Sequence, residues 1–174
     1  MQVVTFFLLH VATSSNPSLQ RIALGIRCSN NDYSFALLKG TKKAPQVVNT
    51  KTATFPKGYT RPDSLRWLYQ EIDDYLINHK GISHLVVKGV EAMAQKGSSY
   101  TDRVECEAIL FLAAANHGLT AIRKVKPTIA KDLGLAGRAK ALDENLDTSV
   151  ISDFQNYSTK EQEAVLAAWS DLKS

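Results

Sequence analysis

The sequence predicts one α/β domain built on a mixed five-stranded sheet, with helices on both faces. Two observations carry this prediction. Three apolar segments near the start of the chain are joined by short turns, as in an antiparallel meander. Two more apolar segments follow, each preceded by a helix-length segment, and strands separated in this way run parallel with right-handed crossovers. We therefore expect strands one to three to pair antiparallel and strands one, four and five to pair parallel.

The meander opens the domain. Residues 21–27 (RIALGIR) predict a buried strand, and the Asn-Asn-Asp turn at 30–32 leads into a second strand at 33–38. A further turn precedes a third strand at 46–55, where Val and Thr are enriched. Short turns leave no room for a crossover, so these strands are expected to be neighbours in the sheet.

The remaining elements follow from the spacing of apolar residues and from helix caps. A well-marked helix is capped by Asp63 or Ser64 and ends before Gly81. The last helix, at 159–173, begins with Ser158 and Glu161 in an S-x-x-E capping box. Between these helices we expect, in order, a strand centred on residues 85–87, a loop at 89–99, a helix at 100–118, a strand at 120–125, and helices at 127–133 and 136–146.

Residues 1–20 form an N-terminal extension to a domain at 21–174, and we expect an extra strand or an extended arm there. No Lys or Arg precedes the apolar run of this extension, and His10 interrupts it, which argues against an export signal. No apolar run approaches the ~20 residues of a membrane span. Cys28 and Cys106 match no metal-ligand spacing and are expected to be reduced, buried thiols. These features are typical of a cytoplasmic protein.

The charge distribution indicates a phosphate-bearing partner. The net charge is +4, and basic residues are concentrated in residues 118–140. This segment contains six basic residues and one acidic residue, Asp132. Such a block favours nucleic acid, although a solvated helix face is the common alternative. The basic residues are Arg123, Lys124, Lys126, Lys131, Arg138 and Lys140.

Four short motifs lie in a fixed order along the domain. They are Ala23-Leu24-Gly25-Ile26 in strand one, Leu85-Val86-Val87 in strand four, Glu105-Cys106-Glu107-Ala108 in the next helix, and Lys126-Pro127 with Gly137-Arg138-Ala139-Lys140 after strand five. With this order and spacing, residues 21–169 resemble the RNase H-like superfamily, specifically the RuvC-type branch that includes Holliday-junction resolvases. The resemblance implies an RNase H-like fold, a nucleic-acid partner and a homodimer. In that branch the equivalents of Lys131 and of residues 137–140 approach the nucleic-acid backbone.

The chain departs from that branch where the chemistry would take place. Active members place an aspartate at the end of strand one, a glutamate at the end of strand four and an acidic pair at the last helix, and these carboxylates hold two divalent cations. Here Arg27 and Lys88 stand at the first two positions. Because these strands are expected to be neighbours, two cations replace two anions at one place, where they repel Mg²⁺. The resemblance therefore implies a degenerate site with no metal.

Three functions remain open on the sequence. One is a nuclease whose Mg²⁺ site is rebuilt from Glu105, Glu107 and Glu163, although Glu105 or Glu107 could instead pair with Arg27 or Lys88 in a structural ion pair. Another is a protein-interaction scaffold that keeps only the fold. The leading one is a catalytically degenerate protein that binds nucleic acid, or another phosphate-bearing ligand, through Arg27, Lys88, Lys96, Arg123, Lys124, Lys126, Lys131, Arg138 and Lys140.

Overall fold

A computed structural model describes residues 21–91 and 97–174 of the chain. The N-terminal extension expected at 1–20, and Lys96, lie outside the described residues. No helix of the described part is long and apolar enough to cross a membrane.

A five-stranded sheet in the order β3-β2-β1-β4-β5 forms the centre of the domain. β1 pairs antiparallel with β2, which pairs antiparallel with β3, whereas β4 is parallel to both β1 and β5. The predicted mixed sheet, including the direction of every strand, is confirmed. The strands are β1 (Arg21–Cys28), β2 (Asp32–Thr41), β3 (Ala44–Thr54), β4 (His84–Lys88) and β5 (Thr120–Lys124).

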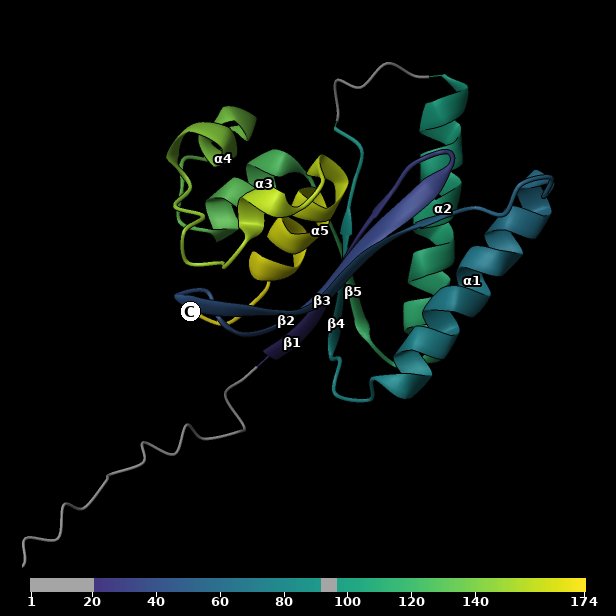
Figure 1. The fold of residues 1–174 in the computed structure, drawn as a ribbon, viewed down its shortest axis with the longest axis horizontal. Helices are drawn as coiled ribbons and strands as arrows, with labels where there is room; N and C mark the ends of the chain where they lie inside the picture. Colours follow the sequence, from purple (N-terminus) through teal and green to yellow (C-terminus); the bar gives the residue numbers. More distant parts are fainter. Residues whose placement is uncertain (1–20, 92–96) are drawn as a thin grey trace, which may run out of the picture.

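Helices cover both faces of the sheet, as expected. α1 (Arg61–Asn78) and α2 (Ser98–Asn116) lie together on one face, and the other helices lie on the opposite face (Figure 1). The first layer closes over the larger apolar core, which includes Leu24, Leu68 and Leu110. The second layer consists of α3 (Lys126–Asp132), α4 (Ala139–Asn145), the 3-10 helix η2 (Phe154–Asn156) and α5 (Thr159–Trp169).

Most element boundaries differ by a few residues from the sequence-based expectation, and those of α1 and α5 have a clear physical reason. α1 begins at Arg61 with Thr60 as its N-cap, whose side chain accepts a hydrogen bond from the Asp63 N–H. The predicted caps, Asp63 and Ser64, are wrong because Thr60 lies two residues before Pro62, and proline is favoured in the first turn of a helix. The last helix ends at Trp169 instead of residue 173, but its Ser158 and Glu161 capping box is present as predicted.

Gly25 lets α5 lie directly against β1. A Cβ atom added at Gly25 would lie 2.1 Å from the backbone oxygen of Ala164 and 2.8 Å from the backbone nitrogen of Ala168. Both distances are far inside van der Waals contact, so only glycine fits at this point of the strand. Because Ala164 follows Glu163, this close approach brings the carboxylate of Glu163 to the end of β1.

Candidate functional site

Arg27 and Lys88 lie side by side at the carboxyl ends of two neighbouring parallel strands. β1 and β4 are in register from Ala23 with His84 to Ile26 with Val87, so Arg27 and Lys88 come next on their strands. The expectation that these two cations share one place in the fold is therefore confirmed. The carboxyl ends of parallel strands are where α/β folds bind their ligands.

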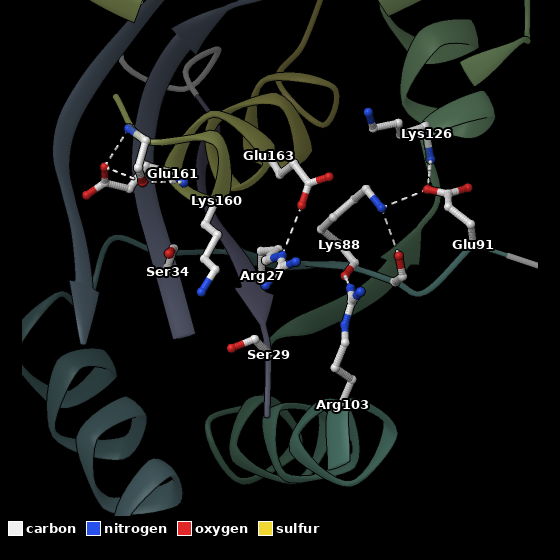
Figure 2. A network of polar contacts seen from close by, with 12 residues as sticks. Arg27, Ser29, Ser34, Lys88, Glu91, Arg103, Lys126, Lys160, Glu161 and Glu163 are labelled. Carbon is white, nitrogen blue, oxygen red and sulfur yellow. Dashed lines mark hydrogen bonds and ion pairs between the residues drawn. The ribbon is translucent and has the colours of Figure 1, made fainter. Parts of the chain in front are cut away.

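Arg27 is held by a carboxylate from the last helix. Its Nε donates to Oε2 of Glu163 over 3.0 Å, and both side chains are largely buried, with 17% and 19% of their surface exposed (Figure 2). Glu163 follows the capping box by two residues, and α5 is fixed over β1 by the contact at Gly25. The end of β1 is thus occupied by an internal ion pair.

Lys88 is held by a different carboxylate, Glu91. Nζ of Lys88 lies 2.8 Å from Oε1 of Glu91 and donates to the carbonyl oxygen of Gly89 over 2.9 Å. The same Glu91 oxygen accepts the backbone N–H of Lys126, the first residue of α3, over 3.0 Å (Figure 2). Burial alone would raise the pKa of Glu91, but the hydrogen bonds from Lys88 and Lys126 outweigh burial and lower it. Glu91 therefore ties β4 to the start of α3.

Arg103 reaches the same strand ends from α2, on the other side of the sheet. Its guanidinium points at the backbone carbonyl of Lys88, with Nη2 3.5 Å from that oxygen (Figure 2). Burial lowers the pKa of Arg103, and the nearby charge of Arg27 lowers it further. The sequence reasoning did not single out Arg103. The sequence did contain one indication of its place. Arg103 lies four residues, about one helical turn, before Glu107, so both side chains lie on the same face of α2.

The glutamates of the second helix do not pair with Arg27 or Lys88, so that expectation was wrong. Glu105 lies 2.7 Å from Nε of Arg61, at the start of α1. Glu107 is buried and lies 2.7 Å from Nε of Arg123, whose side chain passes over Gly89. Burial raises the pKa of Glu107, and the charge of Arg123 opposes this rise. Helical periodicity places both glutamates on α2, but their partners come from elements that only the tertiary fold brings near.

These pairings decide whether Mg²⁺ fits. Glu105, Glu107 and Glu163 each bind a different arginine. Within residues 21–91 and 97–174, no three His, Cys, Asp or Glu side chains come together as a metal-ligating group. Mg²⁺ requires several oxygen ligands in octahedral geometry, and a carboxylate bound to a guanidinium has already satisfied its charge. The donor set at the strand ends does not fit a divalent cation.

The basic block divides into buried and exposed residues. Lys124 is buried, and its Nζ lies 2.9 Å from Asp132 and 3.4 Å from Asp171. It is therefore unavailable to a ligand, contrary to expectation, and Arg123 is committed to Glu107. Lys126 is partly exposed and lies 3.8 Å from Asp143. Exposed residues of the block that form no ion pair with any described carboxylate are Lys131, Arg138 and Lys140.

These three exposed cations belong to α3 and to the N-cap and first turn of α4, two helices that pack against each other. A Cβ atom added at Gly137 would lie 3.8 Å from Cβ of Lys131 and 3.7 Å from the carbonyl oxygen of Pro127. Gly137 therefore lies against α3 at Lys131, and Arg138 is the next residue along the chain. We call Lys131, Arg138 and Lys140 the basic face. α3, which carries Lys131, begins at the strand ends, where Glu91 accepts the N–H of Lys126.

Cys106 is buried next to Cys28, as expected for packed thiols. Its Sγ lies 3.4 Å from Nη2 of Arg61. Contact with the Cys28 thiol lowers the pKa of Cys106 to about 7, with a further contribution from the positive charge of Arg61, while burial opposes this change. Full burial keeps this thiol away from any substrate.

Comparison with known proteins agrees with the fold. No family model matches the sequence, and no curated protein matches it. A structure of Thermus thermophilus RuvC superposes with a TM-score of 0.66 at 9% identity, covering 86% of this chain and 92% of that one. RuvC of T. thermophilus in complex with a Holliday junction substrate gives 0.65 at 6% identity, with coverages of 86% and 91%. The yeast mitochondrial Holliday junction resolvase Ydc2 gives 0.54 at 11% identity, with coverages of 86% and 75%.

The architecture therefore belongs to the α/β folds that carry a mixed sheet with three antiparallel strands followed by parallel ones. More specifically, the chain has the RNase H-like, RuvC-type fold of these resolvases, which confirms the resemblance seen in the sequence. At identities of 6 to 11% the likeness concerns the fold. The side chains at the strand ends are this chain's own.

Proposed function

We propose that this protein binds the phosphate backbone of nucleic acid through the basic face and does not cleave it by a metal-dependent route. One observation carries the proposal. At the strand ends, Arg27 and Lys88 are each neutralised by a carboxylate of the chain itself, Glu163 and Glu91. The fold of a nuclease is thus combined with a site whose carboxylates are already bound to cations.

The exposed cations support the binding half of the proposal. Lys131, Arg138 and Lys140 face solvent without a described carboxylate partner, so their charge is available to a phosphate. Lysine and arginine at such positions bind the backbone by releasing counterions, a contribution that depends on salt and not on sequence. The neighbouring resolvase folds act on Holliday junctions according to their names, which makes branched DNA the first substrate to test.

The test is a binding and cleavage assay on the same preparations. Fluorescently labelled four-way junction, duplex and single-stranded DNA and RNA are titrated at low salt, and cleavage is followed in Mg²⁺ and in Mn²⁺. We expect binding without cleavage. Metal-dependent cleavage that Glu163→Gln abolishes would instead establish a nuclease with a rebuilt glutamate site. Absence of binding at low salt would favour a protein-interaction scaffold. Light scattering with and without the junction tests the homodimer that the resemblance implies.

A further inference from the structure

The charges at the strand ends do not balance. Three cations meet there, Arg27, Lys88 and Arg103, but only Glu163 and Glu91 approach them within ion-pair distance. The next carboxylate is that of Glu107, whose Oε2 is bound by Arg123 from β5, while its Oε1 is buried without a hydrogen bond and lies outside ion-pair distance of Arg103. Arg103 is therefore the cation without a carboxylate partner among the described residues. Residues 1–20 and 92–96 contain no Asp or Glu that could serve in its place.

Hydrogen bonding at this point is also incomplete. Nη1 of Arg27 and Nε of Arg103 are buried and have no partner in the described part of the chain. Arg103 makes one long hydrogen bond, to the carbonyl oxygen of Lys88. Buried donors are almost always paired in folded proteins, and a buried charge without a partner is costly. One unpaired donor on each of two neighbouring guanidinium groups therefore indicates a ligand that accepts hydrogen bonds and carries negative charge.

One of the two guanidinium groups comes from the central sheet and the other from the α1–α2 layer. Arg27 projects from β1 toward α5, and Arg103 rises from α2 past the end of β4 (Figure 2). After burial, the charge of Arg27 lowers the pKa of Arg103, and the charges of Glu107 and Glu163 oppose this change. A phosphate group offers two to three oxygens to such a pair, and the planar fork of arginine matches phosphate geometry. Lys88 is not part of this pair because its ammonium is turned toward Glu91 and Gly89.

We propose that Arg103 and Arg27 form an anion site that binds one phosphate group at the carboxyl ends of β1 and β4. The inference rests on the proposed function and deepens it. The basic face holds the backbone along α3 and α4, and the arginine pair anchors one phosphate at the strand ends. Binding at this site removes the charge imbalance, so it stabilises the folded protein.

Inorganic phosphate tests the site without nucleic acid. Thermal unfolding is measured in phosphate and in chloride at equal ionic strength, for the unaltered protein, Arg103→Gln, Arg103→Lys and Arg66→Gln. Arg66→Gln is the matched control, because it removes an exposed arginine from α1. We expect phosphate to raise the Tm of the unaltered protein and of the control. Arg103→Gln should lose this rise, and Arg103→Lys should keep part of it, since lysine retains the charge but lacks the fork.

The same variants tested on junction DNA separate this inference from the proposed function. Arg103→Gln should weaken binding roughly tenfold, as expected for loss of a charge-assisted hydrogen bond, and should lower the salt slope by about 0.9. The anion site is overturned if phosphate raises the Tm of Arg103→Gln as much as that of the unaltered protein. It is also overturned if phosphate raises the Tm of neither. If Arg103→Gln binds DNA as tightly as the unaltered protein, the anion site is also overturned, but the proposed binding through the basic face is kept. If Arg103→Gln loses the phosphate-dependent rise in Tm, but neither the unaltered protein nor any variant binds DNA, the anion site is supported and the proposed function is refuted.

Discussion

Nε of Arg27 lies 3.0 Å from Oε2 of Glu163, so the end of β1 is joined to α5 by an ion pair. A carboxylate on this helix suits either a metal or an arginine. The residue on β1 decides between them. With Arg27 in place, Glu163 acts as a structural partner.

The coupling between these two residues can be measured. We expect Arg27→Met or Glu163→Gln alone to cost about 2 kcal/mol in the free energy of unfolding, between the values typical of exposed and of buried ion pairs. The double variant should cost less than the sum of the two, because neither charge is then left unpaired. Urea unfolding of all four proteins gives the coupling energy. Strictly additive effects would show that the pair contributes nothing to stability.

Gly25 should be intolerant of a side chain. Gly25→Ala places a methyl group 2.1 Å from the carbonyl oxygen of Ala164, so α5 must shift away from β1. We expect a loss of about 3 kcal/mol, typical of overpacking against backbone. Gly97→Ala is the control, because nothing lies within 4 Å of its added Cβ. A loss at Gly25→Ala no larger than that of the control, in urea unfolding, would contradict the close packing of α5.

Glu91 makes stability depend on pH in a defined direction. Its pKa is lowered in the folded protein, so its contribution is present above the pKa of the unfolded chain, about 4.3, and is lost as the pH falls through the folded value. At pH 7, Glu91→Gln leaves the buried Lys88 unpaired and should cost about 3 kcal/mol. The difference from the unaltered protein should shrink in acid. A difference that stays constant from pH 7 to pH 3 in urea unfolding would contradict this assignment.

Carboxylates restored at the strand ends should create a metal site. In Arg27→Asp with Lys88→Glu, both new carboxylates join Glu163, which already points at this position. We expect about 1.4 kcal/mol of stabilisation when Mn²⁺ is present at ten times its Kd. The unaltered protein should show none, since two unit charges ~4 Å apart repel by roughly 4 kcal/mol at an effective dielectric of ~20. Adding Glu163→Gln to the double variant should abolish the stabilisation by Mn²⁺. If the stabilisation persists, the metal binds at another place.

The sequence predicted the fold better than the contacts at the site. Strand directions followed from turn lengths and helix-length spacers, which are local properties of the chain. The partners of Lys124, Glu105 and Glu107 were not predictable, because each lies outside the element that carries the residue, and packing decides which outside charge it meets. Lys124 looked like part of a basic surface, yet the register of β5 turns it toward Asp132 and Asp171. Local patterns place a residue on an element, but only packing decides which charge it meets.

The contacts of Arg103 were also not predictable from local sequence patterns. On the sequence it is one charged residue near the start of a long helix. Its importance arises because α2 aims it at the end of β4, where the available carboxylates are already paired. No periodicity or motif could show that imbalance, since it is a property of several elements together.

The salt dependence of junction binding in two charge-matched triple variants tests the central claim most directly. The first replaces Lys131, Arg138 and Lys140 by alanine, and the control replaces Lys51, Arg66 and Lys80, which are exposed and lie on β3, α1 and the segment after α1. Each phosphate contact contributes about 0.9 to the slope of log K against log salt concentration, so loss of the basic face should lower the slope by about 2.7. The control should keep the slope of the unaltered protein. Equal slopes in the two triple variants would contradict binding through the basic face.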